Sequence, residues 1–283
     1  MTPSILLATD LDRTLMPNGS QAESPLARPL FRRLAKRSEI SLAYVTGRHP
    51  ALVEAAIAEY ALPRPAYVIA DVGASIYRLD ADAWTLRQDW VDVISAAWSG
   101  LDHARLAALL QDISDLRLQE VSKQGVFKLS YYAAPLTDPA DLLQRVRERL
   151  APSGAEVNLI WSIDETRATG LLDILPATAS KLHALEFLRA RLGIELQKTM
   201  FAGDSGNDMA VLVSDIPSLL VANAQDAVRA EATARANPAA LYLAVGGLFG
   251  MNGNYSAGIL EGLVHFMPEA RAWLAPATVQ TLF

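Results

Sequence analysis

Short apolar runs alternate with helical patterns along the first 70 residues of the chain. The runs Ile5–Thr9, Ile40–Val45 and Tyr67–Ala70 have the length and composition of buried strands. Between them, Leu26–Lys36 and Ala51–Tyr60 carry apolar residues at helical spacing. Because strands that alternate with helices form βαβ units, this part of the chain predicts a parallel sheet.

The same alternation returns in the second half of the chain. Gly193 follows the first of the late helices and is predicted to cap it. The expected helices and strands are Ser180–Leu192, Met200–Ala202, Met209–Val213, Leu219–Ala222, Ala227–Ala236 and Ser256–Phe266. Together the two halves predict the α/β class, with a Rossmann-like parallel-sheet core and helices on both of its faces.

The middle of the chain has a different pattern. Along Val126–Tyr132, one strand face would carry Phe127, Leu129 and Tyr131, and the other Lys128, Ser130 and Tyr132, which predicts a half-covered strand. Asp138 and Pro139 are typical of a helix start, and Val157–Trp161 is a further strand candidate. We therefore expect a core domain over 1–83 and 167–283, with an inserted α+β cap domain over 84–166.

Composition narrows the classes of function. The 283 residues are 51% hydrophobic and 20% charged, which is typical of a chain with a sizeable core. A formal net charge of -6 argues against a nucleic-acid partner, and the lack of cysteine excludes thiolate catalysis and disulfides. The start of the chain does not resemble a signal peptide, and no stretch is apolar enough to span a bilayer. The sequence therefore predicts a cytoplasmic protein with no membrane partner.

Two pairs of acidic residues each follow a predicted strand. Asp10 and Asp12 come directly after the first strand, and Asp204 and Asp208 follow the strand Met200–Ala202. The carboxyl ends of parallel strands meet at one edge of a sheet, so the two pairs would face one crevice. Mg²⁺ prefers such oxygen ligands and would offset the repulsion between the carboxylates. The alternatives are a solvated turn for the first pair and a helix cap for the second.

Two further segments could bind an anion. Thr46, Gly47 and Arg48 link the second strand to a helix, where a hydroxyl and backbone N–H groups can hold a phosphate. Lys181 lies at the start of a helix, an unfavourable place for a cation in the helix dipole. The alternatives are an ordinary turn and a surface lysine. The four histidines lack the spacing of ligands, so none is predicted to bind a metal.

The ordered motifs DLDRT, TGR, a lysine and GDSGND resemble those of the haloacid dehalogenase superfamily. A closer resemblance is to sucrose-phosphate phosphatases, in the stretches YVTGR, IADVGASIY, VSKQGVFKLSYY, DILPATASK, FAGDSGND, VANAQ and YSAGILEGLVHF. The chain departs from that family where Ala179-Ser180 stands for a common Gly-Asn pair. The resemblance is to the short bacterial forms, so the extra C-terminal domain of the plant members is not expected.

The resemblance implies a Mg²⁺-dependent phosphatase that forms an aspartyl-phosphate. It implies Asp10 as the nucleophile and Asp12 as the general acid and base. The implied metal site consists of Asp10, the backbone carbonyl of Asp12, and Asp204, with Asn207 and Asp208 around it. Thr46, Gly47, Arg48, Lys181 and Asn207 are the implied phosphate-binding and supporting residues.

The implied substrate is a sugar phosphate, most specifically sucrose-6-phosphate. The synthase that makes this compound is an expected protein partner. From the cap, Lys123, Gln124 and Lys128 are candidates to bind sugar hydroxyls, with solvated edge charges as the alternative for the two lysines. Other open possibilities are mannosyl-3-phosphoglycerate or glucosylglycerol phosphate as substrate, a phosphomutase, and a catalytically silent domain that binds a sugar phosphate or a partner protein.

Overall fold

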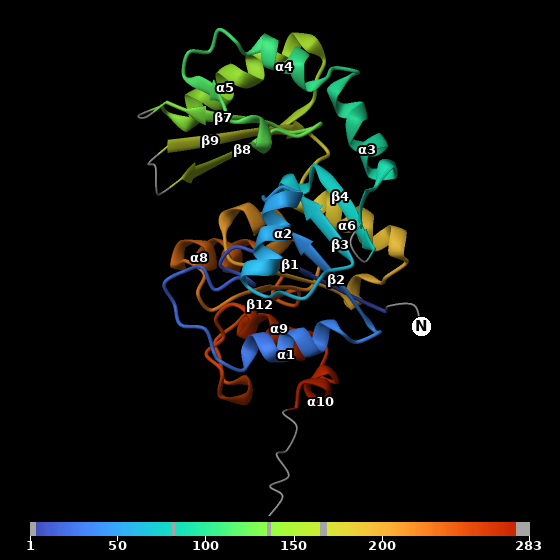
Figure 1. The fold of residues 1–283 in the computed structure, drawn as a ribbon. Coiled ribbons are helices and arrows are strands. Elements are labelled where there is room, and N and C mark those ends of the chain that lie inside the picture. Colours follow the sequence, from blue (N-terminus) through green and yellow to red (C-terminus); the bar gives the residue numbers. More distant parts are fainter. Residues whose placement is uncertain (1–3, 81–82, 135–136, 165–168, 276–283) are drawn as a thin grey trace, which may run out of the picture. The chain divides into compact units, whose positions relative to one another are not determined.

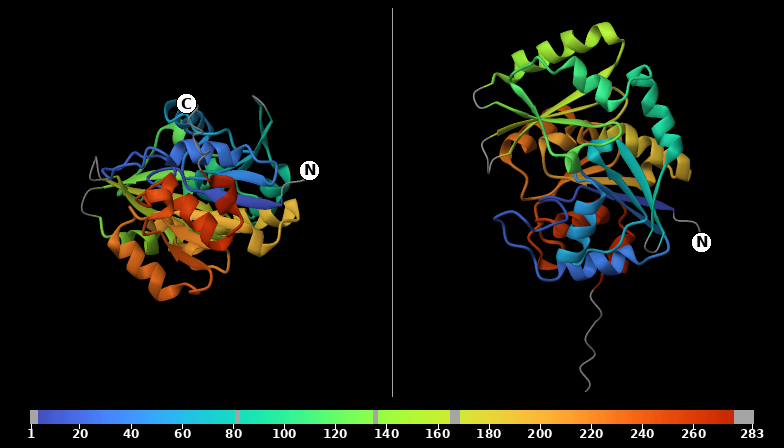
Figure 2. Two further views of the ribbon diagram at one scale, coloured as in Figure 1. Left: turned by 90° about the horizontal axis from the view of Figure 1, so that it is seen from below. Right: turned by 45° about the horizontal axis from the view of Figure 1, so that its top comes forward.

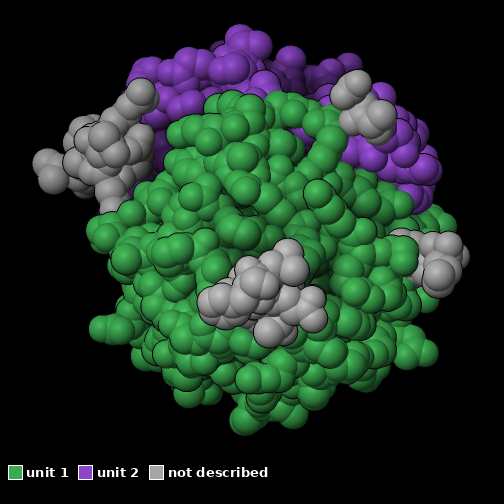
Figure 3. Space-filling model, turned by 60° about the horizontal axis from the view of Figure 1, so that its bottom comes forward, with its two compact units in different colours: residues 1–45, 52–67, 189–283 green, residues 46–51, 68–188 purple. Residues whose placement is uncertain are grey.

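The structure is a computed structural model that describes residues 4–80, 83–134, 137–164 and 169–275. The chain divides into two compact units. Unit 1 comprises 1–45, 52–67 and 189–283, and unit 2 comprises 46–51 and 68–188 (Figure 3, green and purple). Because the segments of each unit are far apart in the sequence, each unit is assembled by long-range packing and is described by itself below.

Unit 1 contains the parallel strands of the central sheet. Their order is β12-β11-β10-β1-β2, and Ala8 of β1 lies opposite Phe201 of β10 and Ala43 of β2. Every residue of β1, β2, β10 and β11 is buried, as expected for parallel strands covered on both faces. The strands are β1 (Ile5–Thr9), β2 (Ile40–Val45), β10 (Thr199–Gly203), β11 (Ser218–Leu220) and β12 (Leu241–Leu243).

Helices cover this sheet. Helix α1 packs against α9 and α10, while α9 also packs against β11 and β12 (Figures 1 and 2). A Cβ on Gly262 of α9 would lie 2.3 Å from Leu219 Cδ2, so glycine permits this close approach to the sheet. The helices are α1 (Ala27–Ala35), α7 (Met209–Leu212), α8 (Asp226–Arg235), α9 (Ser256–Phe266) and α10 (Ala270–Leu274). Two more, α2 (Pro50–Glu59) and α6 (Lys181–Leu192), have residues in both units.

Unit 2 has an antiparallel sheet of its own, in the order β6-β7-β9-β8. Helices α4 and α5 pack on it (Figures 1 and 2) and enclose a core that includes Trp98, Leu129 and Leu172. The unit also contains a β4–β5 hairpin and α3. Its elements are β3 (Tyr67–Ala70, from Val68 on), β4 (Ser75–Asp80), β5 (Ala83–Leu86), α3 (Gln88–Ser95), α4 (His103–Leu109), β6 (Leu116–Leu118), β7 (Leu129–Ala133), α5 (Pro139–Leu150), β8 (Val157–Asp164) and β9 (Thr169–Pro176).

The predicted fold class is confirmed, with β1, β2, β3 and α9 at the predicted bounds. One prediction is wrong: β7 is buried along its whole length and is not half-covered. The polar groups of its second face can be buried because they have hydrogen-bond partners, such as Asp173 Oδ1 of β9, which accepts from Ser130 Oγ at 2.5 Å. The division into 1–83, 84–166 and 167–283 stays a prediction, and its boundary at 166 lies outside the described residues.

Candidate active site

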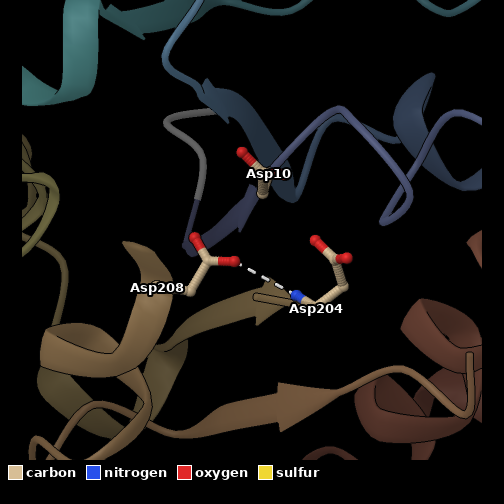
Figure 4. A group of neighbouring side chains, drawn as sticks. All are labelled: Asp10, Asp204 and Asp208. Atoms are coloured by element: carbon tan, nitrogen blue, oxygen red, sulfur yellow. Dashed lines mark hydrogen bonds between the residues drawn. The ribbon is translucent and has the colours of Figure 1, made fainter. Parts of the chain in front are cut away.

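Three buried carboxylates gather at the carboxyl ends of β1 and β10. Asp10, Asp204 and Asp208 each place one oxygen within 4.8 Å of the others (Figure 4). Asp10 follows β1, and its backbone N–H donates to Ala202 of β10 at 2.9 Å, so the two strand ends are held together. The edge predicted from the strand pattern therefore brings both acidic motifs to one place.

Asp208 is held by the turn that follows β10. Its Oδ2 accepts hydrogen bonds from the backbone N–H groups of Asp204 at 3.1 Å and Ser205 at 3.2 Å (Figure 4 shows the first). Ser205 and Asp208 form a reciprocal capping box around the short helix Gly206–Asp208. A Cβ on Gly203 would lie 2.7 Å from the Asp208 carboxyl carbon, so this approach requires glycine.

Asp204 is contacted by residues of the first acidic motif. Thr14 Oγ1 donates to Asp204 Oδ1 at 3.1 Å, and Arg13 Nε lies 3.6 Å from Asp204 Oδ2. The arginine side chain is 34% exposed, so solvent screens much of its charge. These contacts orient the Asp204 carboxylate toward the other two.

Asp12 is partly exposed and lies in a turn after β1. Its Oδ1 accepts a hydrogen bond from Asn18 Nδ2 at 2.8 Å, while Asn18 Oδ1 accepts one from the backbone N–H of Arg13 at 2.7 Å. The side chain of Asn18 therefore closes the turn and orients the carboxylate of Asp12.

The three-carboxylate group fits a hard divalent cation. Its donors are carboxylate oxygens, which Mg²⁺ prefers, and the burial of three like charges would be costly without a cation to offset them. Asn207, the other predicted residue in this turn, is exposed, and its Oδ1 accepts a bond from Ser205 Oγ at 3.1 Å.

The predicted phosphate-binding loop lies in unit 2. Thr46 is buried, and its Oγ1 accepts the backbone N–H of Arg48 at 3.1 Å, while Gly47 is exposed. The backbone of Thr46 also donates to Ile69 at 2.8 Å and accepts from Val72 at 3.0 Å. The loop is thereby fixed to the end of β3.

Lys181 is the first residue of α6 and is buried. Gly73 approaches the start of this helix so closely that a Cβ would lie 2.2 Å from the carbonyl carbon of Ser180. Burial and the helix dipole both disfavour a cation at this position, which excludes the alternative of a surface lysine. The role of Lys181 in phosphate binding stays a prediction.

The three cap candidates differ in their surroundings. Gln124 bonds to the cap backbone, because its Nε2 donates to the carbonyls of Gln119 and Ser130 and its Oε1 accepts from Ser130 N–H. Lys123 is half-exposed and donates to Tyr132 Oη at 2.9 Å. Lys128 is buried between Asp71 and Asp173. As substrate-binding residues all three stay predictions.

Comparison with known proteins identifies the family. A family model described as sucrose-6F-phosphate phosphohydrolase matches residues 3–267. The chain belongs to this family. It is therefore a phosphatase of the haloacid dehalogenase type, a phosphoric monoester hydrolase.

Individual relatives agree with this membership. A protein of Nitrosococcus oceani, named only as a HAD-like hydrolase, is 53% identical over 97% of this chain and 75% of its own length. The mannosylfructose-phosphate phosphatase of Agrobacterium fabrum is 28% identical over 79% of this phosphatase and 85% of its own length. The sucrose-phosphatase of Synechocystis, solved with sucrose and phosphate, is 26% identical, with a TM-score of 0.75 over 93% of this chain and 98% of its own.

Other relatives are longer than this phosphatase. The chain spans 52% and 59% of the length of two plant proteins with sucrose-phosphatase names. Within the described residues, no helix has the length and apolar character needed to cross a membrane.

The structure adds residues that the motifs did not single out for a role. Buried Asn223 donates from Nδ2 to the carbonyl of Arg13 at 2.6 Å and accepts the N–H of Tyr255 at 2.8 Å. It thereby ties the turn after Asp12, in which Arg13 has a φ of 58°, to the start of α9. Its only signal in the sequence was its place in VANAQ, and the signal of Thr14 was its place in DLDRTL.

Proposed function

We propose that this phosphatase hydrolyses sucrose-6-phosphate to sucrose and inorganic phosphate, with Mg²⁺ and through a phosphorylated Asp10. The observation that carries the proposal is the buried group of Asp10, Asp204 and Asp208. It lies at the ends of two parallel strands in a chain that matches the sucrose-6F-phosphate phosphohydrolase family over residues 3–267.

In the first step, an oxygen of the Asp10 carboxylate attacks phosphorus, and the bond between phosphorus and the sugar oxygen breaks. Asp12 donates its proton to the departing oxygen, so the sugar leaves as a neutral alcohol. The partly exposed position of Asp12 in its turn supports this role, because a proton carrier must reach both the substrate and water.

In the second step, water attacks the phosphorus of the aspartyl-phosphate, and the bond to the Asp10 oxygen breaks. Asp12 accepts the proton of this water and is ready for the next cycle. Asn18 supports both steps by donating to Asp12 Oδ1, which holds the carboxylate in one orientation.

Negative charge on the phosphate opposes attack by a carboxylate. Asp10 and Asp204, with the carbonyl of Asp12, would hold Mg²⁺, which neutralises phosphate charge when bound. Asp208 would support the metal site indirectly. It accepts hydrogen bonds from the Asp204 and Ser205 N–H groups and so fixes the turn that carries Asp204. Thr46, Gly47, Arg48 and Lys181 would bind the phosphoryl oxygens.

The substrate follows from relatives whose names concern disaccharide phosphates. The Synechocystis structure was solved with sucrose and phosphate, and the Agrobacterium relative is named for mannosylfructose-phosphate. We infer sucrose-6-phosphate as the preferred substrate and mannosylfructose-phosphate as the second candidate. The association with a sucrose-phosphate synthase stays a prediction.

A substrate panel tests the proposal. Purified protein with Mg²⁺ is offered sucrose-6-phosphate, mannosylfructose-phosphate, glucosylglycerol phosphate, mannosyl-3-phosphoglycerate, glucose-6-phosphate and fructose-6-phosphate, and released phosphate is measured. We expect the highest kcat/KM for sucrose-6-phosphate, because contacts to the second sugar would orient the substrate. Equal efficiency on all sugar phosphates would indicate a generalist, and no hydrolysis of any of them would indicate a silent binding domain.

A further inference from the structure

A large cavity lies wholly within unit 2. Its volume is 1080 Å³, and residues from the start of α2, β4, α3 and the segment 121–127 line it. Its polar lining consists mainly of His49, Asp71, Gln88, His103 and Gln124, and Tyr77 and Phe127 add aromatic surface. The rest of the lining is largely aliphatic. A mainly apolar wall with a few hydrogen-bonding groups is suited to a small organic molecule whose hydroxyls those groups can bind.

The cavity begins beside the predicted phosphate-binding loop. His49, which lines it, directly follows Thr46, Gly47 and Arg48 in the chain. Asp71, on the same wall, donates its backbone N–H to the carbonyl of Arg48 at 3.2 Å. A phosphate held by the loop would therefore have its organic part close to this cavity.

The charge of the cavity wall is distinctive. Of the described residues that line it, none is a lysine or an arginine, Asp71 is the one carboxylate, and His49 and His103 are the groups that can carry positive charge. Lys128 is outside this lining, with its Nζ 3.5 Å from Asp71 Oδ1 and 3.8 Å from Asp173 Oδ2. One ammonium is thus shared by two carboxylates, so this cluster keeps a net negative charge when both are ionised.

The position of Asp71 is strongly constrained. Asp71, Val72 and Gly73 have φ values of 52°, 59° and 102°, a left-handed run that is costly for a β-branched residue such as Val72. The carboxyl is buried, and this burial raises its pKa, while the charge of Lys128 opposes the rise. Backbone strain of this kind persists where the surroundings hold it, and it is frequent at functional sites.

We propose that Asp71 determines specificity by accepting a hydrogen bond from a hydroxyl of a neutral leaving group and by repelling a leaving group that carries a second anionic charge. This inference rests on the proposed phosphatase function. It adds that the preferred leaving group is uncharged. A hydroxyl can donate to a carboxylate, whereas a phosphate or carboxylate brought beside Asp71 would meet like charge.

Fructose-6-phosphate and fructose-1,6-bisphosphate form a matched test, because they differ by one phosphate. The measured quantity is the ratio of kcat/KM for the monophosphate to that for the bisphosphate, with sucrose-6-phosphate as the reference substrate. We expect a high ratio for the wild type and a ratio at least ~10-fold lower for Asp71→Asn, since one like charge removed at close range is worth a factor of this order.

Two further variants distinguish the charge of the cavity wall from the release of Lys128 and from a loss of folding. Asp173→Asn also removes a partner of Lys128, but Asp173 does not line the cavity. The monophosphate-to-bisphosphate ratio of this variant should therefore stay near that of the wild type. Gln88→Lys adds a cation to the lining at an exposed position, leaves Asp71 intact and should also lower the ratio. This second variant keeps the test decisive if Asp71→Asn fails to fold.

The outcomes distinguish the two proposals. An equal fall for Asp173→Asn and Asp71→Asn would show that released Lys128 sets the preference, and it would overturn the role of Asp71. An unchanged ratio in Gln88→Lys would show that the cavity does not receive the leaving group. If the wild type cleaves no sugar phosphate at all, the proposed function itself fails, whereas activity with an unmoved ratio rejects only this inference.

Discussion

Two clusters of carboxylates, one in each unit, differ in how their charge is balanced. In unit 1, Asp10, Asp204 and Asp208 converge, and a half-exposed arginine, Arg13, reaches Asp204 at 3.6 Å. In unit 2, Asp71 and Asp173 share the ammonium of Lys128, which is itself buried. The first cluster has the donors of a cation site, and the second contains its own cation.

The difference indicates that the first cluster is suited to catalysis, whereas the second is held in a fixed position by its ammonium. Oxygens that converge at strand ends can exchange water, cation and phosphate, so that region suits chemistry. A carboxylate held by a buried ammonium is costly to move, because breaking such a pair leaves an uncompensated charge. The predictions below test whether catalysis depends on the first cluster and structure on the second.

The largest effect is expected for Asp10→Asn. An amide is a poor nucleophile, so turnover of the preferred sugar phosphate should fall by ~10⁴-fold or more. Released phosphate under saturating substrate measures it, with Asp173→Asn as the control that should retain turnover. Near wild-type turnover by the Asp10→Asn protein would exclude the aspartyl-phosphate mechanism.

Asp12→Ala should have the next largest effect. General acid–base catalysis typically contributes ~10²- to 10⁴-fold, so kcat should fall by this factor while KM changes little. Steady-state kinetics over a range of substrate concentrations separates the two constants. A variant that loses affinity alone would make Asp12 a binding residue.

Lys128→Met tests the second cluster through stability. The substitution leaves the buried Asp71 and the partly exposed Asp173 without their ammonium, so the free energy of unfolding should fall by ~3–5 kcal/mol. Chemical denaturation measures it, and the control is Lys198→Met. Lys198 pairs with Glu269 at 3.4 Å on the surface, where a loss of ~0–1 kcal/mol is expected. Similar losses in both variants would contradict the structural role of Lys128.

Magnesium should stabilise the protein through the first cluster. At ~100 times its dissociation constant, Mg²⁺ adds ~2.7 kcal/mol to stability, and a chelator should reverse the gain. Thermal unfolding measures it without any need for activity. Asp204→Asn should abolish the gain and Asp173→Asn should keep it, so the reverse result would assign the cation to unit 2.

Part of the candidate site could be predicted from the local pattern of apolar residues. Asp10 and Asp204 were placed at one sheet edge because each follows an apolar run, and parallel strands end at the same edge. The class of fold and the bounds of β1, β2 and β3 followed from the same periodicity, whereas β4, β5, β6, β9 and β12 were not predicted. Local chemistry also predicted the helix start at Asp138, whose side chain accepts the N–H of Ala140 at 3.0 Å.

Partners distant in the sequence could not be predicted in this way. Asn223 reaches the carbonyl of Arg13 across 210 positions, and no periodicity links two such residues. The burial of both faces of β7 likewise depends on which polar groups β9 and the segment 119–124 present to it.

The sequence by itself determined the α/β class, the acidic residues at strand ends and the family they belong to, because these depend on local spacing and residue type. Only the tertiary structure decided that Lys128 lies between Asp71 and Asp173, and that Asn18 and Asn223 hold the turn of Asp12. It also decided that a cavity without lysine or arginine among its described lining residues adjoins the loop 46–48. The reason is physical: a side chain's partner and its exposure are set by segments that meet only when the chain folds.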